Sequence, residues 1–546
     1  MFSPRSFYLI VLLVGAQAGP VVDLGYGQYE GSVENTTLIT SFLGIRFAAA
    51  PTGDLRFRAP QPPVTVKGVQ PATVESNYCP QSGDGTSPTN PFNKRSAGPD
   101  EDCLFLNVFY PSNGAGKPNG GDLPVIVWIH GGGYVAGGAI GVPGGDLITQ
   151  SNRGVVTVVI QYRLGLFGFL PGAEVKKGGT LNAGLLDQDY ALRWINKHIS
   201  KFGGDPSKVA IWGDSAGAGS VLQHVVANGG KTEPQLFRVA MTSSTFLPSQ
   251  YAYNDRIPEL LFSEVVAQSN CTKAKDALTC LRGVDQTVLA NINAKINNAA
   301  FYGVFQFVPV VDGEFITQRP TLSMLEQKVN GEVLLSVTNT FEGTNFVNQS
   351  VPTEAGAYSH SLFPKLTTLQ TNAIAKLYRG LGTETFQDSA IMGESIFICP
   401  TFYLLHAFQG RAYKGEFAVP PGLHGNDYAY YFPSGGPPPA PYNTPSFTNA
   451  FAQSFTSFAL NLDPNVKVKV NGTTDITPKW SKYDLGNTEM LFNMTADGTP
   501  DIKAVWMSKA LLERCVCVII SLFACVFNVH NPKVVSNIRT ADKRKL

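Results

Sequence analysis

Four short apolar runs stand out along the chain, each rich in β-branched residues and without polar alternation. This pattern predicts strands buried on both faces, at 125–129, 155–161, 209–212 and 333–337. Residues 184–201 predict a helix between the second and third runs, because they carry apolar side chains at near-helical spacing: Leu185, Leu192, Trp194, Ile195 and Ile199. The order strand, helix, strand indicates a parallel sheet, so we expect an α/β fold.

The first 18 residues have the pattern of a secretion signal. Arg5 supplies a basic start, and residues 7–14 are apolar but too few to span a bilayer. Ala16 and Ala18 give the small residues that a signal peptidase accepts. We therefore expect cleavage near Ala18 and an extracellular protein.

The other end of the chain is unusual. Residues 516–529 are apolar and precede a basic tail, but the run is shorter than the roughly 20 residues that a membrane helix needs. We expect no stable membrane span. Three interpretations of this segment are open: a marginal tail anchor, a buried helix, or a mis-assembled gene end in which 516–546 is translated from an intron. Residues 19–515 are assigned to one large domain.

The charge balance limits the possible partners. Lys and Arg number 42 against 41 Asp and Glu, a net charge of +1, which argues against nucleic acid because phosphate binding needs a basic excess. Charged residues make up only 15%, below the roughly 25% of an average soluble domain. Glycans can supply the missing surface polarity, and five N-x-Ser/Thr sequons are candidates: Asn35, Asn270, Asn348, Asn471 and Asn493.

The chain has eight cysteines. Cys79 and Cys103 flank a polar loop, so a local disulfide is expected there in an exported protein. Cys271 and Cys280 close a tighter loop and are a second candidate pair. Cys399 stands alone, and the remaining three cluster near the C-terminal end: Cys515, Cys517 and Cys525.

The most specific local motif is the pentapeptide Gly-Asp-Ser-Ala-Gly at 213–217. It follows the predicted strand 209–212 and precedes a helical pattern at 216–227, which is the context of a nucleophile elbow. The flanking glycines fit a sharp turn in which backbone packs against backbone and any side chain would clash. We therefore predict that Ser215 is a nucleophile at a helix N-terminus.

A glycine loop directly follows the predicted strand 125–129, with the sequence His-Gly-Gly-Gly-Tyr at 130–134. A serine that attacks an ester creates an oxyanion, which needs preorganised N–H donors. Glycine backbone offers such donors without side-chain obstruction, and it pairs with the residue after the nucleophile. The predicted donors are the N–H groups of Gly132, Gly133 and Ala216.

A serine hydroxyl is a poor nucleophile until a base takes its proton. The chain has seven histidines, and the order nucleophile, acid, base leaves His406 and His424 as contenders. His406 lies in an apolar helical run, where a core histidine is expected. His424 lies in a loop before a strand-like run at 428–432, and loops carry catalytic groups on rigid scaffolds. We predict that His424 is the base.

The acid must orient the imidazole and therefore requires a carboxylate between Ser215 and His424 in the chain. Glu342 follows the predicted strand 333–337 at its C-terminal end, where active groups of such sheets gather. Asp312 is the rival, and it can simply close a turn. We predict that Glu342 is the acid.

With these residues in place, the sequence resembles the type-B carboxylesterase/lipase family, the cholinesterase-like α/β-hydrolases, and especially their secreted fungal members. The resemblance covers nearly all of 22–515 and rests on eight motifs: FLGIRFAAAPTGDLRF (42–57), EDCLFLNV (101–108), HGGGY (130–134), YRLGLFGFL (162–170), GLLDQDYALRWI (184–195), FGGDPSKVAIWGDSAG (202–217), FEGTNF (341–346) and HGNDYAYYF (424–432). It implies an α/β-hydrolase fold, with a large, mostly parallel central sheet flanked by helices.

The resemblance also implies an activity. It implies a serine carboxylic-ester hydrolase with Ser215 as nucleophile, Glu342 as acid and His424 as base, acting without metal or cofactor. The expected substrate is a small-molecule or lipid ester. Two disulfides are implied as well: Cys79–Cys103 and Cys271–Cys280.

Departures from the family bear on specificity. Asp214 precedes the serine where the family often has Glu, which leaves the chemistry intact. No Trp lies between Cys79 and Cys103, where cholinesterases carry a choline-stacking Trp, so choline esters are disfavoured. That loop is polar, whereas long-lidded lipases carry a longer, more amphipathic flap, so we favour an esterase over a lipase on long-chain acylglycerols. A non-catalytic binding protein is disfavoured, because the nucleophile, acid, base and glycine loop are all kept.

Overall fold

The computed structural model describes residues 19–84, 100–435, 440, 444–468, 475–483 and 487–515. Its main sheet has 11 strands: β3 (Ser32–Glu34), β4 (Ile39–Arg46), β6 (Phe105–Pro111), β7 (Leu123–Ile129), β8 (Val156–Ile160), β9 (Gly204–Asp214), β10 (Val239–Ser243), β11 (Val333–Asn339), β12 (Ala412–Phe417), β13 (Thr488–Met494) and β14 (Pro500–Trp506). A smaller sheet has three strands: β1 (Val21–Asp23), β2 (Gln28–Glu30) and β5 (Val69–Pro71).

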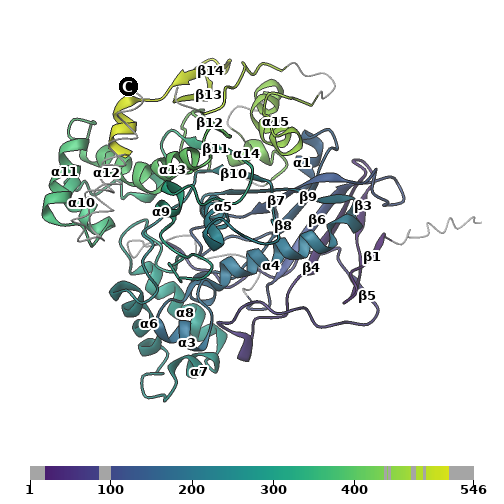
Figure 1. Cartoon of the computed structure of the whole chain (residues 1–546), viewed down its shortest axis with the longest axis horizontal. Coiled ribbons are helices and arrows are strands. Elements are labelled where there is room, and N and C mark those ends of the chain that lie inside the picture. The colour runs from purple at the N-terminus through teal and green to yellow at the C-terminus, as the bar shows by residue number, and fades with distance from the viewer. Residues whose placement is uncertain are drawn as a thin grey trace, which may run out of the picture.

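The main sheet is mostly parallel and forms the centre of the molecule (Figure 1). Its strand order is β14-β13-β12-β11-β10-β9-β7-β8-β6-β4-β3. All neighbours from β13 to β8 are parallel, and antiparallel pairs form the two edges. The four strands predicted from apolar runs correspond to β7, β8, β9 and β11, and the expected α/β fold is confirmed.

Both faces of the sheet are buried, as the missing polar alternation predicted. On β7, Val125, Val127 and Ile129 belong to one hydrophobic core. The alternate residues Ile126 and Trp128 belong to a second core on the opposite face. Successive side chains of a strand point to opposite faces, so each face needs its own cover of helices.

Helices supply that cover: α1 (Gly145–Gln150), α2 (Gly165–Phe169), α3 (Ala173–Gly178), α4 (Ala183–His198), α5 (Ala216–Val226), α6 (Arg256–Gln268), α7 (Ala277–Arg282), α8 (Gln286–Asn298), α9 (Pro320–Leu325), α10 (Ala355–Leu362), α11 (Thr368–Tyr378), α12 (Glu384–Gly393), α13 (Cys399–Ala407), α14 (Tyr428–Tyr431) and α15 (Pro445–Asn461). α4, predicted from its apolar spacing, packs with α5 into the first core, and α1, α14 and α15 pack into the second (Figure 1).

The strand predicted at 428–432 is wrong, because this segment forms the short helix α14. Tyr431 stacks against Phe451 of α15 with 5.2 Å between ring centroids, and its hydroxyl donates to Asp427 Oδ2 at 2.8 Å. Tyr430 is buried against Phe447 of the same helix. Burial of these rings overrides the β-propensity of a tyrosine-rich run.

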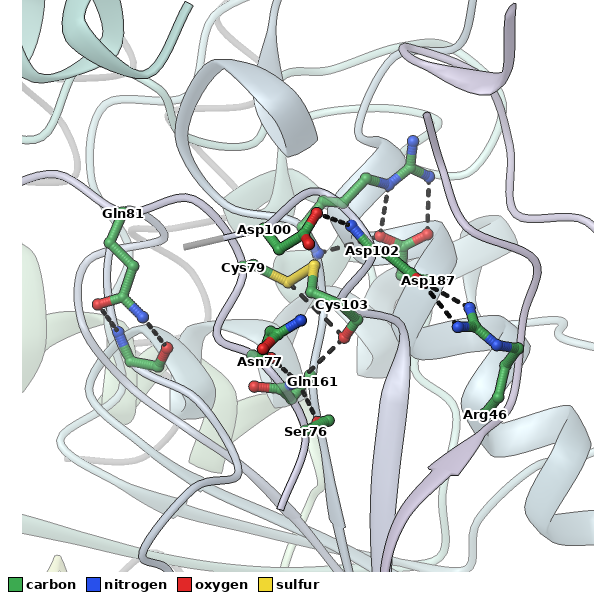
Figure 2. Close-up of a disulfide and its surroundings, with 12 residues drawn as sticks. Arg46, Ser76, Asn77, Cys79, Gln81, Asp100, Asp102, Cys103, Gln161 and Asp187 are labelled. Atoms are coloured by element: carbon green, nitrogen blue, oxygen red, sulfur yellow. Dashed lines mark hydrogen bonds and ion pairs between the residues drawn. A yellow bond between two sulfur atoms is a disulfide. The ribbon is translucent and has the colours of Figure 1, made fainter. Parts of the chain in front are cut away.

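Three disulfides join described cysteines. The two expected pairs are present, Cys79–Cys103 and Cys271–Cys280, the first at the base of a loop (Figure 2). The expectation that Cys399 stands alone is wrong, because it pairs with Cys515 across 116 positions of sequence. Only the folded chain brings α13 beside residues 509–515, so spacing in the sequence held no signal for this pair.

Several predicted features lie outside the described residues: the signal at 1–18, the segment 516–546 with Cys517 and Cys525, and the sequon at Asn471. Of the other sequon asparagines, Asn35 and Asn270 are exposed. Asn348 and Asn493 are partly buried.

Within the described residues, one helical stretch, Glu384–Ala407, is long and apolar enough to cross a membrane. It joins α12 and α13 through a π-helical turn, η5 (Glu394–Ile398). However, 78% of its most apolar window is buried inside the protein. A core helix has the same character.

Candidate active site

Ser215 occupies the turn between β9 and α5. Its backbone has φ 52° and ψ −123°, which L-residues rarely adopt. A Cβ on Gly213 would lie 2.4 Å from the carbonyl carbon of Gly217. A Cβ on Gly217 would lie 2.0 Å from the carbonyl oxygen of Ile129. The turn therefore needs glycine on both sides of the serine, and it presents Ser215 at the carboxyl edge of the sheet.

The glycine loop lies beside this turn. A Cβ on Gly131 would lie 3.1 Å from the Cβ of Ser215, and the Gly131 N–H donates to Asp214 Oδ1 at 3.0 Å. Gly132 and Gly133 have φ values of 100° and 63°, in the left-handed region that favours glycine. The sequence of the loop thus permits a backbone conformation that other residues would strain.

The three N–H groups predicted as oxyanion donors have no hydrogen-bond partner among the residues that the structure describes. Those of Gly132 and Gly133 make no hydrogen bond to any residue that the structure describes. Ala216 is the first residue of α5, where an N–H has no partner inside the helix. Their role as oxyanion donors stays a prediction.

His424 lies between β12 and α14, and its ring contacts Glu342. The distance from His424 Nδ1 to Glu342 Oε2 is 2.5 Å. Phe346 and Phe397 pack against the imidazole, with ring centroids 5.0 and 4.5 Å away. Only 10% of the His424 side chain is exposed. The carboxylate occupies Nδ1, so Nε2 is the ring nitrogen that can still bind or release a proton.

Two donors hold the Glu342 carboxylate, and sequence reasoning missed both. Ser244 Oγ donates to Glu342 Oε1 at 2.7 Å, and the backbone N–H of Asn339 donates to the same oxygen at 2.6 Å. The Asn339 side chain also donates to Ser244 Oγ at 3.1 Å and to Asp427 Oδ1 at 3.0 Å. The only sequence signal is position: Asn339 ends β11, and Asp427 follows His424 by three residues.

The end of β10 connects the serine turn to the acid. The Ser215 N–H donates to the carbonyl oxygen of Ser243 at 2.9 Å. The next residue, Ser244, donates its hydroxyl to Glu342. One strand end therefore separates the nucleophile candidate from the acid candidate, as expected where parallel strands end at one edge.

The charges around His424 favour its protonated form. Burial lowers the pKa of His424, but Glu342 raises it and Asp214 and Asp427 raise it further, so the pKa lies above the usual value of 6.5. Burial, with a smaller contribution from Asp427, raises the pKa of Asp214 to about 6. A base with a raised pKa accepts a proton readily.

The two rival residues lie elsewhere. The sequence predicts His406 in the core, and this prediction is wrong. Helix α13 buries its opposite face, so His406 is exposed, and its ring lies 5.6 Å from that of Tyr483. Asp312 is buried, and its Oδ1 accepts the N–H groups of Glu314 and Ile316 at 2.7 and 3.0 Å. Asp312 therefore closes a turn, the structural role that its sequence position also allowed.

A cavity of about 400 Å³ lies beside the site. Phe346 and Phe397, which contact His424, form part of its wall. Phe305 also lines it, and this ring lies 2.1 Å from where a Cβ on Gly133 would stand. None of the described lining residues is Asp, Glu, Lys, Arg or His. Among the residues that the structure describes, no group of three or more His, Cys, Asp or Glu is arranged to hold a metal ion.

The fold defines an α/β-hydrolase, with the serine turn, the glycine loop and the His–Glu pair at one edge of a mostly parallel sheet. The family model described as the carboxylesterase family matches residues 18–508. The chain therefore belongs to the carboxylesterase family and is a carboxylic ester hydrolase.

Individual relatives agree with this assignment. Secreted lipase 1 of Botryotinia fuckeliana is 30% identical over 517 residues, which cover 84% of this chain and 86% of that protein. Carboxylesterase patB of Aspergillus clavatus is 30% identical over 484 residues, with 78% and 86% covered. The crystal structure of Aspergillus niger EstA superimposes with a TM-score of 0.80 at 29% identity, covering 92% of this chain and 98% of EstA. A secreted relative and three disulfides fit an extracellular location.

Proposed function

We propose that the protein is an exported serine ester hydrolase that works through an acyl-enzyme, with Ser215 as nucleophile, His424 as base and Glu342 as the acid that orients it. The 2.5 Å contact between Glu342 Oε2 and His424 Nδ1, at the sheet edge that carries the Ser215 turn, is the observation that carries this proposal. A carboxylate on Nδ1 holds the imidazole in the tautomer whose Nε2 accepts a proton.

The reaction has two halves. Ser215 Oγ attacks the ester carbonyl carbon while His424 Nε2 takes the hydroxyl proton, and the N–H groups of Gly132, Gly133 and Ala216 stabilise the oxyanion. Collapse of this intermediate breaks the bond to the alcohol oxygen, which His424 protonates. Water then attacks the acyl-enzyme with His424 again as base, and the acid leaves.

Neutral esters with an apolar acyl group are the proposed substrates. The cavity volume of about 400 Å³ falls in the usual range for ligand pockets, about 300–1,000 Å³. A charged acyl group would lose its hydration there without gaining an ionic partner from the wall. Long-chain acylglycerols are the second candidate class, favoured by this apolar wall and by the lipase among the relatives.

We extend the proposal to the processing of the chain. The pattern of residues 1–18 supports export with cleavage near Ala18. The exposed asparagines of two sequons, Asn35 and Asn270, are the positions where we expect glycans first. Residues 19–515 are proposed as one hydrolase domain, since the bond from Cys399 to Cys515 ties position 515 to the core helix.

Ester hydrolysis by the purified, full-length protein tests the proposal. We expect Ser215→Ala to lower kcat on p-nitrophenyl butyrate by about 10³-fold or more. Ser207→Ala, at an exposed serine of the same strand, is the matched control and should keep full activity. A fluorophosphonate should add its mass to the peptide that contains Ser215.

The same assay separates the candidates. A preference for p-nitrophenyl butyrate supports the esterase, and a preference for the palmitate ester supports the lipase. Activity on neither ester would leave a binding protein as the better description. Full activity of Ser215→Ala would contradict the assigned nucleophile.

A further inference from the structure

The glycine loop, defined here as residues 131–137 and called the oxyanion loop below, contains a chain of hydrogen-bonded peptide groups. The N–H of Ala136 donates to the carbonyl of Gly132 at 2.9 Å, and the N–H of Val135 donates to the same oxygen at 3.0 Å. The Gly132 carbonyl and the Gly133 N–H belong to one planar trans peptide and point in opposite directions. Holding the Gly132 carbonyl therefore sets the direction of the Gly133 N–H, a proposed oxyanion donor.

The segment just after Cys79 extends this chain of hydrogen bonds. The N–H of Ser82 donates to the carbonyl of Val135 at 2.8 Å. That carbonyl shares its peptide plane with the Ala136 N–H, so the hydrogen bond from Ser82 is aligned with the one from Ala136 to Gly132. A continuous series thus runs from Ser82 through two peptide groups of the oxyanion loop to Gly133. Hydrogen bonds in series polarise and strengthen one another.

Gln81 holds the far end of the oxyanion loop. Its Nε2 donates to the carbonyl of Gly137 at 2.6 Å, and its Oε1 accepts the Gly137 N–H at 3.4 Å (Figure 2). A side-chain amide that pairs with both polar groups of one residue restrains its translation and its rotation. At the near end, Gly131 is held by Asp214. The loop is therefore fixed at both ends, by two different parts of the chain.

The base from which Gln81 projects is itself rigid. Cys79, two positions earlier, is bonded to Cys103. The Gln161 side chain donates to the carbonyls of Asn77 and Cys103 at 2.9 and 3.0 Å (Figure 2). Next to the disulfide, Asp102 forms a two-point ion pair with Arg46, at 2.6 and 2.7 Å (Figure 2). Gln81 can therefore transmit the position of this base to the oxyanion loop.

We infer that Gln81 is a positioning residue for catalysis, which holds the oxyanion loop so that the N–H groups of Gly132 and Gly133 meet the developing oxyanion. The inference rests on the proposed function. It gives the Cys79–Cys103 disulfide a catalytic consequence besides stability, because that disulfide fixes the position of Gln81.

The expected effect lies in the transition state and not in substrate binding. Removal of a whole oxyanion donor costs about 10²- to 10³-fold in kcat, and a displaced donor loses part of that. We therefore expect Gln81→Met, which keeps the length of the side chain but makes neither amide contact, to lower kcat on p-nitrophenyl butyrate about tenfold. KM should change less than about twofold, since the ground-state carbonyl uses these donors weakly.

The test uses the full-length protein with two readouts besides kcat. A trifluoromethyl ketone forms a hemiketal whose oxyanion occupies the same N–H groups, so its affinity should fall by the same factor as kcat. The melting temperature should follow that of the control, Gln70→Met. Gln70 is a partly buried glutamine whose amide donates to the carbonyls of Lys67 and Gly68 in exposed hydrogen bonds. If Gln81→Met fails to fold, Gln81→Glu, which loses the donor bond to Gly137, should show the same losses.

Three outcomes would overturn the inference: unchanged kcat with unchanged ketone affinity, a raised KM at constant kcat, or a loss fully explained by a smaller folded fraction. Failure of the proposed function is distinguishable, because Ser215→Ala would then stay active. An inactive Ser215→Ala together with a normal Gln81→Met refutes only the role of Gln81.

Discussion

Two buried carboxylates, Glu342 and Asp427, act on His424 in different ways. Glu342 touches the imidazole directly, and its second oxygen is held by Ser244 and Asn339. Both oxygens of Asp427 accept hydrogen bonds, from the Asn339 amide and a tyrosine hydroxyl, so its influence on His424 is electrostatic. Orientation of the ring therefore depends on Glu342, whereas the raised pKa depends on Glu342, Asp214 and Asp427 together.

The pH dependence of the reaction tests this division. His424 acts as a base only when neutral, so kcat/KM should fall tenfold per pH unit below its pKa, which lies above 6.5. Glu342→Gln removes the stabilising charge, so the acidic limb should move to lower pH while the maximum falls by about 10²-fold or more. Asp427→Asn should move the limb in the same direction with a smaller loss of rate.

Glu314→Gln is the control, at a carboxylate that is 79% exposed. An acidic limb that stays in place or moves to higher pH in Glu342→Gln would contradict the assignment.

The unit formed by β7, β9 and α5 shows how local sequence builds the serine turn. β7 and β9 are paired neighbours, and Gly217 at the start of α5 packs onto the last carbonyl of β7, that of Ile129. A helix can approach a strand this closely only where no side chain intervenes. The geometry of Ser215 therefore depends on the absence of a Cβ at positions 213 and 217.

Two glycine substitutions with opposite expectations test that dependence. Gly217→Ala places a methyl group 2.0 Å from the Ile129 carbonyl oxygen, so the free energy of unfolding should fall by about 1–3 kcal/mol and activity should fall with it. Gly178→Ala is the matched control in α3, where the new Cβ meets only Leu278 at 3.4 Å. There the stability should be unchanged or higher by up to about 1 kcal/mol. Urea unfolding followed by tryptophan fluorescence measures both, and equal effects of the two changes would argue against the close approach.

At the scale of the whole molecule, residues near 515 are bonded to the helical stretch that lines the candidate active site. Arg514 forms a two-point ion pair with Glu394 at 2.7 and 2.6 Å, and the Tyr403 hydroxyl donates to the carbonyl of Cys515 at 2.8 Å. The Cys399–Cys515 disulfide lies between these contacts. The same helical stretch carries Phe397, which packs on His424, so this end of the described chain supports a wall of the site.

Loss of this disulfide should cost more stability than loss of the shorter one. In the chain-entropy treatment, a cross-link over 116 positions restricts the unfolded chain about 2 kcal/mol more than one over 9 positions. We expect the double change Cys399→Ser with Cys515→Ser to lower the free energy of unfolding by about 2–5 kcal/mol. The pair Cys271→Ser with Cys280→Ser is the control, and chemical unfolding of the oxidised proteins compares them. Equal losses would show that native contacts, and not the length of the closed loop, set the effect.

Local patterns in the chain were sufficient for much of the fold. Buried parallel strands need unbroken apolar runs, and a helix on the sheet needs apolar spacing near 3.6, so β7, β8, β9, β11 and α4 were predictable. The glycines around Ser215 and in the oxyanion loop were informative for a related reason. Each satisfies a backbone constraint that neighbouring residues impose, and such constraints can be read along the sequence.

Contacts between distant segments were not predictable in this way. The Cys399–Cys515 bond, the Ser244–Asn339–Asp427 network and the pairing of Gln81 with Gly137 each join positions whose separation in the chain carries no pattern. The tyrosine-rich run of α14 has strand propensity, yet it became helical because α15 buries its rings. Backbone geometry is specified by near neighbours, whereas the partners that orient catalytic groups are chosen by packing of the whole chain.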